Sequence, residues 1–452
     1  MSTQKKVSEF SLKALTLAVA ALSSQAFAQG YQIDEQSARR LGDAFSGGAA
    51  EARDASTGYY NPAGLTRLKQ MELTGGVSVL TTKVEFSGKT TVFTGNPSET
   101  PISGSTVESS SSDVVPNIYF AMPLREGTVL GIALNAPFAS STDYGSDSVV
   151  RYHSVESEVT GARLTFSLGQ EISPDFSVGL GLIVQRMEGS ITTAIDSAAF
   201  CAAAGAPCAA SLGTSADDGE VEYEGDDVAF GYSLGLFYNI GENTRIGFAY
   251  RSAIKSELEG SADVEIPASV EPIISGLSPF LSTHSEGAKF NLTTPESVSL
   301  SAFHQINEKF SLQGDATWTR WSRFEALEIK TESGKGDVTQ EENWKNNWRI
   351  ALGGEYQTTE QLALRAGLAW DQSPVPDANR NVSFPLDDFK AISVGLTYAF
   401  SPSLALDAGL QKTLDFDSDV HEASDDFPLY HEANGNSESD TWSAAVGLNW
   451  KI

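Results

Sequence analysis

Segments in which large apolar side chains recur at every second position constrain this sequence most. The segment Trp348 to Tyr356 reads WRIALGGEY, and the segment Trp442 to Trp450 reads WSAAVGLNW. Successive side chains point to opposite faces of a β-strand, so each segment has one apolar face and one small or polar face. Aromatic residues at the segment ends are typical of the girdles at the two interfaces of a membrane barrel.

Connections of alternating length join these segments. The short ones include 125–127 and 173–175, and the long ones include 195–225 and 416–438. Short periplasmic turns and long extracellular loops are typical of outer-membrane barrels with an even number of strands. A soluble β-sandwich also alternates, but its strands rarely exceed about 10 residues. We therefore predict an all-β fold, a transmembrane antiparallel β-barrel over 71–452 with about fourteen strands: 71–86, 113–124, 127–138, 157–171, 175–194, 226–240, 244–259, 288–306, 308–328, 344–358, 360–371, 389–400, 402–415 and 439–452.

The first 28 residues have the layout of a secretory signal peptide. Lys5, Lys6 and Lys13 precede and flank an apolar run from Ala14 to Leu22, and the triplet Ala-Phe-Ala at 26–28 follows. The run is too short for a membrane-spanning helix, which needs roughly 20 residues. We predict cleavage after residue 28 and export across the inner membrane.

Residues 29–70 do not alternate. Gly42, Gly47, Gly58, Pro62 and Gly64 interrupt them before the first predicted strand begins. A barrel of fourteen strands is wide enough to need filling. We predict that 29–70 form an N-terminal hatch (plug) inside the barrel.

Charge and cysteine content restrict the partners further. The net charge is -29, whereas a nucleic-acid partner requires clustered Lys and Arg, so we expect no nucleic acid. Cys201 and Cys208 are the two cysteines of the chain. Because exported proteins meet an oxidising compartment, we predict a disulfide between them.

Two stretches carry a resemblance to a known family. The N-terminal part reads GYQIDEQS from Gly30, LGDAFSGGAA from Leu41 and YNPA from Tyr60, and WDQSPVPDANR runs from Trp370 to Arg380. Together they resemble the FadL family of outer-membrane channels, over the whole chain after residue 28. The resemblance implies a hatch that contains the triplet Asn61, Pro62 and Ala63, taken here as the hatch gate.

The resemblance also implies a route that needs no energy source. Ligand would enter a groove between extracellular loops, pass to an internal pocket, and leave laterally at a kink of the third strand after the hatch rearranges. The third segment here ends with Asn135 and Pro137, and a proline cannot donate to a sheet ladder, so we expect the kink there. Alternatively, Pro137 simply closes the strand.

Family members hold the ligand carboxylate with basic residues inside the barrel. At the matching positions this sequence has Glu188 and Gln340, so the nearby Arg186 and Lys345 become the candidates. Ordinary lumenal charges are the alternative for both, and this departure leaves a neutral hydrocarbon open as ligand.

An apolar entry groove is expected from the long loops. Within 267–282, apolar residues stand at 270, 273, 274, 277 and 281, which is helical spacing. Such a stripe buries against its neighbours or against a ligand. The candidate groove residues are Phe138, Ile273, Leu277 and Phe280.

Motifs for catalysis and metal binding are weak. The pattern G-x-S-x-G at 231–235 falls within a predicted strand rather than at the sharp strand-to-helix turn that an esterase requires. Asp415, Asp417 and Asp419 begin like a calcium loop, but Val420 replaces its glycine. We therefore expect no enzyme, no cofactor and no metal site.

The function that fits these observations is passive transport across the outer membrane. The expected ligand is a long-chain fatty acid or another hydrophobic small molecule, and the expected surroundings are outer-membrane lipid and lipopolysaccharide. Transport of aromatic or aliphatic hydrocarbons on the same fold and a surface adhesin or phage receptor are the alternatives. No sequence feature specifies an oligomeric state, and we expect a monomer.

Overall fold

The structure is a computed structural model that describes residues 30–93, 100–101, 106–203, 214–276, 280–424 and 430–452. The predicted signal peptide, 1–28, lies outside the described residues and stays a prediction. Among the helices in the described ranges, none has both the length and the apolarity that a membrane span would need.

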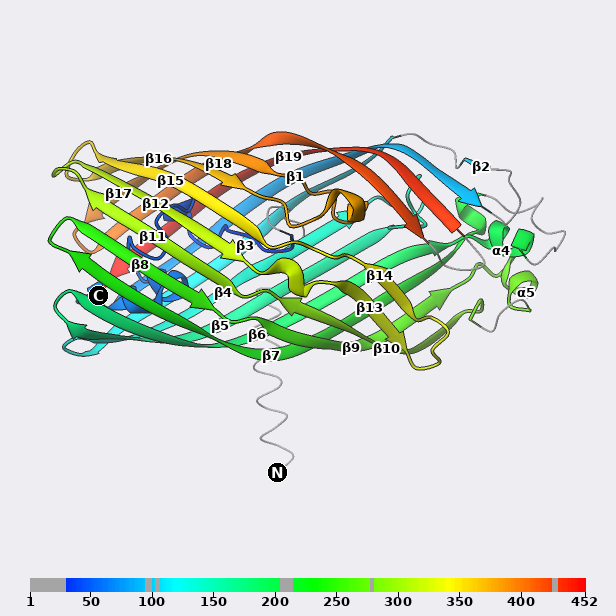
Figure 1. Ribbon diagram of the computed structural model, residues 1–452, viewed down its shortest axis with the longest axis horizontal. Coiled ribbons are helices and arrows are strands. Elements are labelled where there is room, and N and C mark those ends of the chain that lie inside the picture. Colours follow the sequence, from blue (N-terminus) through cyan, green and yellow to red (C-terminus); the bar gives the residue numbers. More distant parts are fainter. Residues whose placement is uncertain (1–29, 94–99, 102–105, 204–213, 277–279, 425–429) are drawn as a thin grey trace, which may run out of the picture.

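The described strands form one antiparallel sheet that closes into a barrel, because β19 pairs with β1 (Figure 1). Four wall positions are each occupied by two consecutive strands with an interruption between them: β8 and β9, β10 and β11, β12 and β13, and β14 and β15. The wall therefore has fourteen strands, as predicted. The strands are β1 (Glu72–Phe93), β2 (Thr100–Pro101), which is a short addition to β1, β3 (Thr106–Arg125), β4 (Thr128–Asp143), β5 (Glu156–Ser173), β6 (Phe176–Ile195), β7 (Gly219–Ile240), β8 (Thr244–Arg251), β9 (Ile254–Glu265), β10 (His284–Thr294), β11 (Ser297–Gln305), β12 (Phe310–Thr319), β13 (Ala326–Thr331), β14 (Val338–Glu341), β15 (Asn347–Gln357), β16 (Leu362–Asp371), β17 (Phe389–Ser401), β18 (Leu404–Ser424) and β19 (Tyr430–Lys451).

Several strands extend beyond the predicted segments at the end that carries the long loops, here called the extracellular end. β1 continues to Phe93 and β18 to Ser424, so much of the expected loops is strand. These extensions are rich in Ser, Thr, Asp and Glu on both faces. Their inward residues are largely buried, as at Ser418 and Val420, but their outward residues are polar and meet water rather than lipid. The apolar alternation is therefore lost, which is why their strand character was missed.

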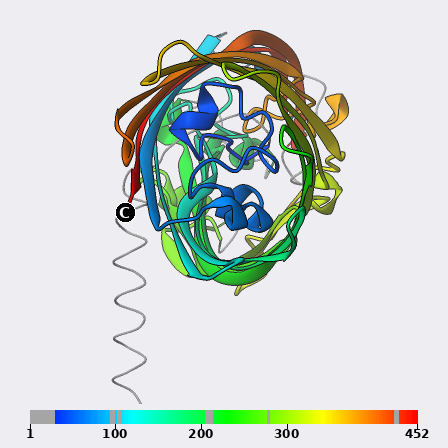
Figure 2. The same ribbon diagram turned by 90° about the vertical axis from the view of Figure 1, so that its left-hand side faces the viewer.

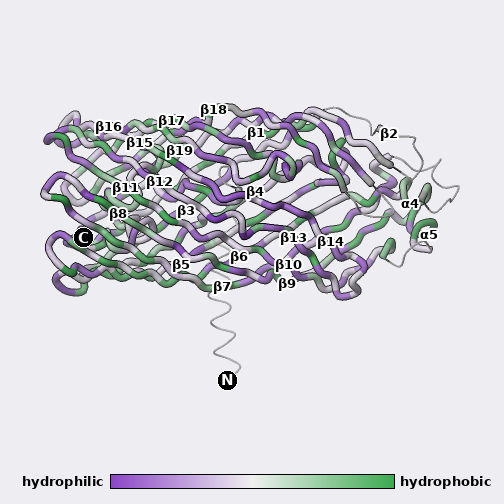
Figure 3. Tube along the Cα trace, viewed as in Figure 1, coloured by the Kyte–Doolittle hydropathy of each residue, from purple (hydrophilic) through white to green (hydrophobic). Residues whose placement is uncertain are grey.

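Apolar side chains cover the outside of the barrel on the half that carries the short turns, here called the periplasmic end. Ile350 and Leu352 on β15 are 50% and 60% exposed, whereas Arg349 and Ala351 between them are buried. Figure 3 shows the resulting alternation of apolar and polar residues along the strands. An outward apolar band of this kind is what a bilayer requires of a barrel.

Short helices lie in the N-terminal segment and in the extracellular loops. The interior ones are α2, α3 and η1, which follow one another before β1 and lie inside the ring of strands (Figure 2). Helix α5 covers a single turn of the predicted stripe. The bounds are α2 (Ala38–Leu41), α3 (Thr57–Tyr60), η1 (Pro62–Arg67), α4 (Ser197–Ala203), η3 (Ser215–Asp217), α5 (Glu271–Ile274), η4 (Trp321–Arg323) and η5 (Asp377–Asn379).

Two wall glycines let η1 approach the barrel closely. A Cβ on Gly179 of β6 would lie 2.2 Å from the Ala63 nitrogen, and a Cβ on Gly235 of β7 would lie 2.0 Å from Asn61 Oδ1. Real Cβ atoms do not approach other atoms so closely, so only glycine fits at these two positions. The segment 30–70 is therefore seated against the wall through η1.

Candidate ligand chamber and lateral opening

A cluster of buried apolar side chains, here called the chamber, lies in the barrel interior around Tyr31. The Tyr31 ring lies 4.8 Å from Trp321, 5.8 Å from Phe138 and 6.1 Å from Trp344, measured between ring centroids. Its hydroxyl donates to the Thr293 carbonyl at 2.8 Å. Further buried members of this cluster are Met187, Leu258, Phe290, Leu292, Phe324, Val375 and Leu386. An apolar interior with few polar groups is what a small hydrophobic ligand requires.

Trp321 and Trp344 lie in segments that interrupt the wall strands. Trp321 stands in η4, between β12 and β13, and Trp344 stands between β14 and β15. Both side chains are buried, at 1% and 2% exposure of the residue. The interrupted wall strands thus supply bulky aromatic residues to the chamber.

Arg163 is a buried cation at the edge of the chamber. The residue is 2% exposed and lies on β5, with its guanidinium 5.2 Å from the centre of the Phe138 ring. Its Nε and Nη2 donate to the neutral Gln185 at 3.2 and 2.5 Å, whereas Nη1 has no hydrogen-bond partner. Within the described residues no acidic side chain forms an ion pair with it. A buried charge without a counter-ion is costly, so the site favours an anionic ligand.

Glu342 is a buried acid beside Trp344 of the chamber. It lies between β14 and β15, and it accepts hydrogen bonds from Trp344 Nε1 at 2.8 Å and Asn381 Nδ2 at 3.1 Å. Burial raises the pKa of Glu342 to about 8, although the hydrogen bond from Trp344 acts in the opposite direction. Glu342 is therefore protonated near neutral pH and does not repel an anion from the chamber.

Stability should depend on pH through Glu342. Its folded-state pKa is raised from 4.5 to about 8, so between these values the folded protein holds a proton that the unfolded chain has released. The contribution of protonated Glu342 to the free energy of unfolding is fully present below pH 4.5. It is lost as pH rises through 8, at up to about 1.4 kcal/mol per pH unit. We expect denaturant unfolding of Glu342→Gln in detergent to show a weaker loss of stability from pH 5 to 9 than the native protein. Parallel pH profiles would contradict the assignment.

The N-terminal segment pairs with β4 where the pairing of this strand with β3 ends. Pairing between β3 and β4 ends at Asn117 and Asn135, and the register between β4 and β5 shifts between Asn135 and Phe138. There, Gln32 forms a bridge with Phe138. Ile33 N donates to the Pro137 carbonyl and Ala139 N to the Tyr31 carbonyl, both at 3.0 Å.

Side chains add to this contact. Asn135 Nδ2 donates to Gln36 Oε1 at 2.9 Å, and Gln36 Nε2 donates to the Ala136 carbonyl at 2.8 Å. Backbone groups of Ala136, Pro137 and Ala139, in the part of β4 that no longer pairs with β3, are thus satisfied by residues 31–36. The chamber, the irregular part of β4 and the start of the N-terminal segment meet at one place.

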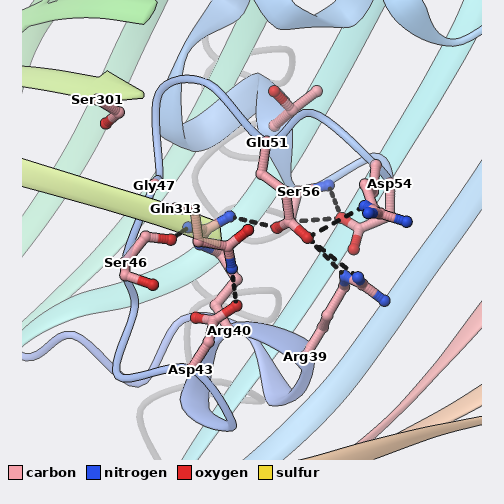
Figure 4. Close-up of polar contacts among 12 residues, drawn as sticks. Arg39, Arg40, Asp43, Ser46, Gly47, Glu51, Asp54, Ser56, Ser301 and Gln313 are labelled. Carbon is pink, nitrogen blue, oxygen red and sulfur yellow. Dashed lines mark hydrogen bonds and ion pairs between the residues drawn. The ribbon is translucent and has the colours of Figure 1, made fainter. Parts of the chain in front are cut away.

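A charge network holds residues 39–53, the middle part of the N-terminal segment. Arg39 Nη2 lies 3.0 Å from Glu51 Oε1, and Arg40 Nη1 lies 2.8 Å from Glu51 Oε2 (Figure 4). Arg39 Nη2 also lies 2.5 Å from Glu355 Oε2 of the wall. Burial by itself would raise the pKa of Glu51, but Arg39, Arg40 and Arg53 hold it well below its usual range. On the wall, Arg365 bridges Glu355 and Asp407, each at 3.2 Å. These contacts fix the residues around α2 to the barrel.

The triplet Asn61, Pro62 and Ala63 is packed as an anchor. Asn61 Nδ2 donates to the carbonyls of Ala49 and Leu236, at 2.8 and 3.0 Å, and Asn61 Oδ1 accepts from Ala63 N at 3.0 Å. All three residues are buried against β6 and β7. The triplet expected as the gate thus packs against β6 and β7, and its gate role stays a prediction. Residues 31–36 contact the irregular part of β4, and Leu65 of η1 contacts β4 at Gly131.

The structure does not place the two head-group candidates from the sequence in the chamber. Arg186 was expected in the interior, but the inward residues of β6 there are Ile183, Gln185 and Met187. Arg186 lies on the outer face, where it pairs with Glu188 at 2.6 Å and Asp226 at 3.4 Å. Lys345 is exposed.

The four groove candidates differ in burial and position. Phe138 is 3% exposed in the chamber, and Phe280 packs against the same apolar cluster. Ile273 is 41% exposed, whereas its neighbour Ile274 is fully buried. Leu277 lies outside the described residues.

The disulfide stays a prediction. Cys201 is buried on α4, and no cysteine among the described residues is free. Its predicted partner, Cys208, lies outside the described residues.

Sequence reasoning missed Arg163, Tyr31, Trp321 and Trp344. Arg163 shares its parity on β5 with the buried Thr165 and Ser167, opposite to the exposed Phe166 and Leu168. Alternation therefore contained the signal that this arginine faces inward. The two tryptophans lie where the strands are interrupted, and alternation does not extend across such breaks.

Comparisons with known proteins agree with this architecture. The family model described as outer membrane protein transport protein (OMPP1/FadL/TodX) matches residues 19–451. A protein of Neisseria meningitidis serogroup B named as an outer membrane protein is 31% identical over 87% of this chain and 88% of its own length. A long-chain fatty acid transport protein of Escherichia coli is 27% identical over 88% of this chain and 90% of its own length.

Solved structures show the same fold. The crystal structure of a Pseudomonas aeruginosa FadL homologue has a TM-score of 0.83 at 23% identity, covering 93% of this chain and 99% of that one. The Pseudomonas putida toluene transporter TodX has a TM-score of 0.66 at 17% identity, covering 94% and 100%. The chain therefore belongs to the outer membrane protein transport family (OMPP1/FadL/TodX) and is an outer-membrane β-barrel transporter of hydrophobic compounds.

Proposed function

We propose that this protein takes up long-chain fatty acids by passive diffusion through the chamber. The observation that carries the proposal is Arg163, a buried guanidinium without an acidic partner among the described residues, beside the buried apolar cluster that contains Phe138. A carboxylate would supply the missing counter-ion, and charge-assisted hydrogen bonds to carboxylates are about twice as strong as neutral ones. The acyl chain would gain roughly 0.8 kcal/mol for each buried CH₂ group.

The route follows from the same contacts. Ligand in the chamber lies beside the bridge between Gln32 and Phe138, which covers the irregular part of β4. We propose that residues 29–70 act as the hatch, and that its start leaves β4 while the charge network and η1 stay seated. Ligand then passes laterally between β3 and β4 into the bilayer, down its own concentration gradient. This role requires no catalysis, and one chain contains the whole route.

A second candidate ligand is an aromatic hydrocarbon. The rings of Tyr31, Trp321, Phe324 and Trp344 lie 4.8 to 6.1 Å apart as neighbours, which suits a flat apolar ligand. Such a ligand would leave Arg163 without a counter-ion. This cost favours the fatty acid.

The test compares ligands that differ only in the head group. Cells that lack their own transporter and express this chain would receive radiolabelled oleate, oleyl alcohol or toluene. We expect oleate uptake well above the vector control and above uptake of oleyl alcohol. Uptake of toluene and oleyl alcohol without oleate would move the ligand to neutral hydrocarbons, and uptake of none would remove the transport proposal for these ligands.

A further inference from the structure

A cavity of about 570 Å³ lies at the periplasmic end of the barrel. Its volume falls within the range of about 300 to 1,000 Å³ that is usual for small-molecule sites. The chain has 59 acidic and 30 basic residues, yet five of the ten residues that line this cavity are basic and one is acidic. The lining residues are Ala52, Arg53, Arg67, Leu68, Lys69, Gln70, Glu72, Arg245, Gln305 and Lys451.

Arg245, on β8, is the buried cation of this cavity. The residue is 8% exposed, and its Nε and Nη2 atoms are buried without a hydrogen-bond partner. Its guanidinium lies flat against Phe303, with Cζ 3.7 Å from the ring centre. No acidic side chain in the described part of the chain forms an ion pair with it. Buried donors without partners cost free energy unless a ligand satisfies them.

Arg67 is a second cation without an acidic partner among the described residues. It closes η1, and its Nη1 donates to the neutral Asn239 Oδ1 at 3.4 Å. Arg53, in contrast, lies 3.4 Å from Glu51 and 3.3 Å from Glu355, so its charge is compensated. Lys69 lies 3.7 Å from Glu171. Two uncompensated guanidiniums thus remain at the cavity, one buried and one exposed.

We propose that this cavity binds a dianion of the phosphate class, such as a phosphate monoester that reaches it from the periplasm. Two uncompensated charges match a dianion, and the guanidinium fork matches phosphate oxygens. Only Ala52 and Leu68 of the lining are apolar, so the cavity offers little surface to an acyl chain. The site is separate from the fatty-acid chamber.

Binding here would join the hatch to the wall. Arg67 belongs to the hatch and Arg245 to the barrel, so one bound anion contacts both. A ligand that binds only the seated hatch stabilises that arrangement by mass action. The proposal therefore includes a stabilising effect of the anion on the folded protein.

The test is equilibrium binding of inorganic phosphate and of glycerol 3-phosphate to the purified full-length protein, at constant ionic strength. We expect both to bind the native protein, and binding to weaken at least about tenfold in Arg67→Gln and in Arg245→Met. Lys309→Gln, which removes an exposed charge at the same end, is the matched control and should bind as the native protein does.

Absence of phosphate binding to the native protein would overturn the proposal, and so would unchanged binding in both arginine variants. If Arg245→Met does not fold, phosphate binding to Arg67→Gln, which changes an exposed residue, decides the test. Octanoate is added as a competing ligand in the same binding experiment. Displacement of phosphate by octanoate at this site would show that the cavity takes carboxylates with acyl chains, which contradicts the phosphate class.

Discussion

Oleate binding is expected to fall at least about tenfold in Arg163→Met, while binding of oleyl alcohol stays unchanged. A hydrogen bond to a charged group contributes about 1.5 to 3 kcal/mol, and 1.4 kcal/mol corresponds to a factor of ten. Methionine keeps an unbranched apolar side chain beside Phe138, so the acyl part of the site is preserved. Equilibrium binding of the two ligands to the purified variant is the measurement.

The stability of the folded protein should not fall on this substitution. Arg163 is 2% exposed and has no acidic partner among the described residues, so its removal relieves a desolvation cost. We expect the unfolding midpoint of Arg163→Met to equal or exceed that of the native protein. Arg163→Lys, which keeps the charge but loses the fork, should retain part of the preference for oleate. Equal losses for oleate and oleyl alcohol would mean that Arg163 only shapes the chamber.

The strands in the bilayer could be predicted from the sequence because the bilayer imposes alternation on them. Leu364 and Leu368 face lipid while Ala363 and Arg365 face inward, and the pattern is visible without a structure. Beyond the bilayer, the outward residues of β1 and β18 meet water instead of lipid and are polar, so this signal is lost. The total of fourteen strands was therefore predictable, but their outer bounds were not.

The proposed head-group site could not be located from charge alone. Arg186 and Arg163 are both arginines on neighbouring strands, and one faces outward and the other inward. They differ in the strand face on which they lie, that is, in their parity along the strand. They also differ in whether an acidic side chain serves as counter-ion. Arg186 has Glu188 and Asp226, whereas Arg163 has only Gln185 and a phenylalanine ring among its described contacts. Parity can be read from a sequence, but the missing counter-ion depends on contacts across the barrel.

The contact between residues 31–36 and β4 was equally beyond sequence reasoning. It joins segments about one hundred residues apart, through backbone groups whose partners no side-chain pattern specifies. Pro137 does indicate an irregular strand, because it cannot donate to a ladder. Which segment would occupy the freed backbone positions became visible only in the folded chain.

A disulfide between Gln32→Cys and Phe138→Cys is expected to abolish oleate uptake until it is reduced. The bonds from Ile33 N to Pro137 O and from Ala139 N to Tyr31 O flank this pair, which makes it a non-hydrogen-bonded pair of an antiparallel bridge. Such pairs have Cα atoms about 4.5 Å apart, within the range of about 4.4 to 6.8 Å for disulfides. The cross-link would hold the N-terminal segment over the irregular part of β4. Uptake of oleate before and after dithiothreitol is the measurement, with both single-cysteine variants and the reduced native protein as references.

The matched control joins the hatch to the wall at its anchored end. Thr66 Oγ1 lies 2.8 Å from Ser177 Oγ, so Thr66→Cys with Ser177→Cys places two thiols in reach of each other. We expect this cross-link to leave uptake unchanged, because η1 is already seated against β6 and β7. If the oxidised Gln32 and Phe138 cross-link also transports oleate at the native rate, the hatch need not leave β4. Ligand would then leave the chamber by another path, and the interrupted wall between β12 and β13 would become the next place to test.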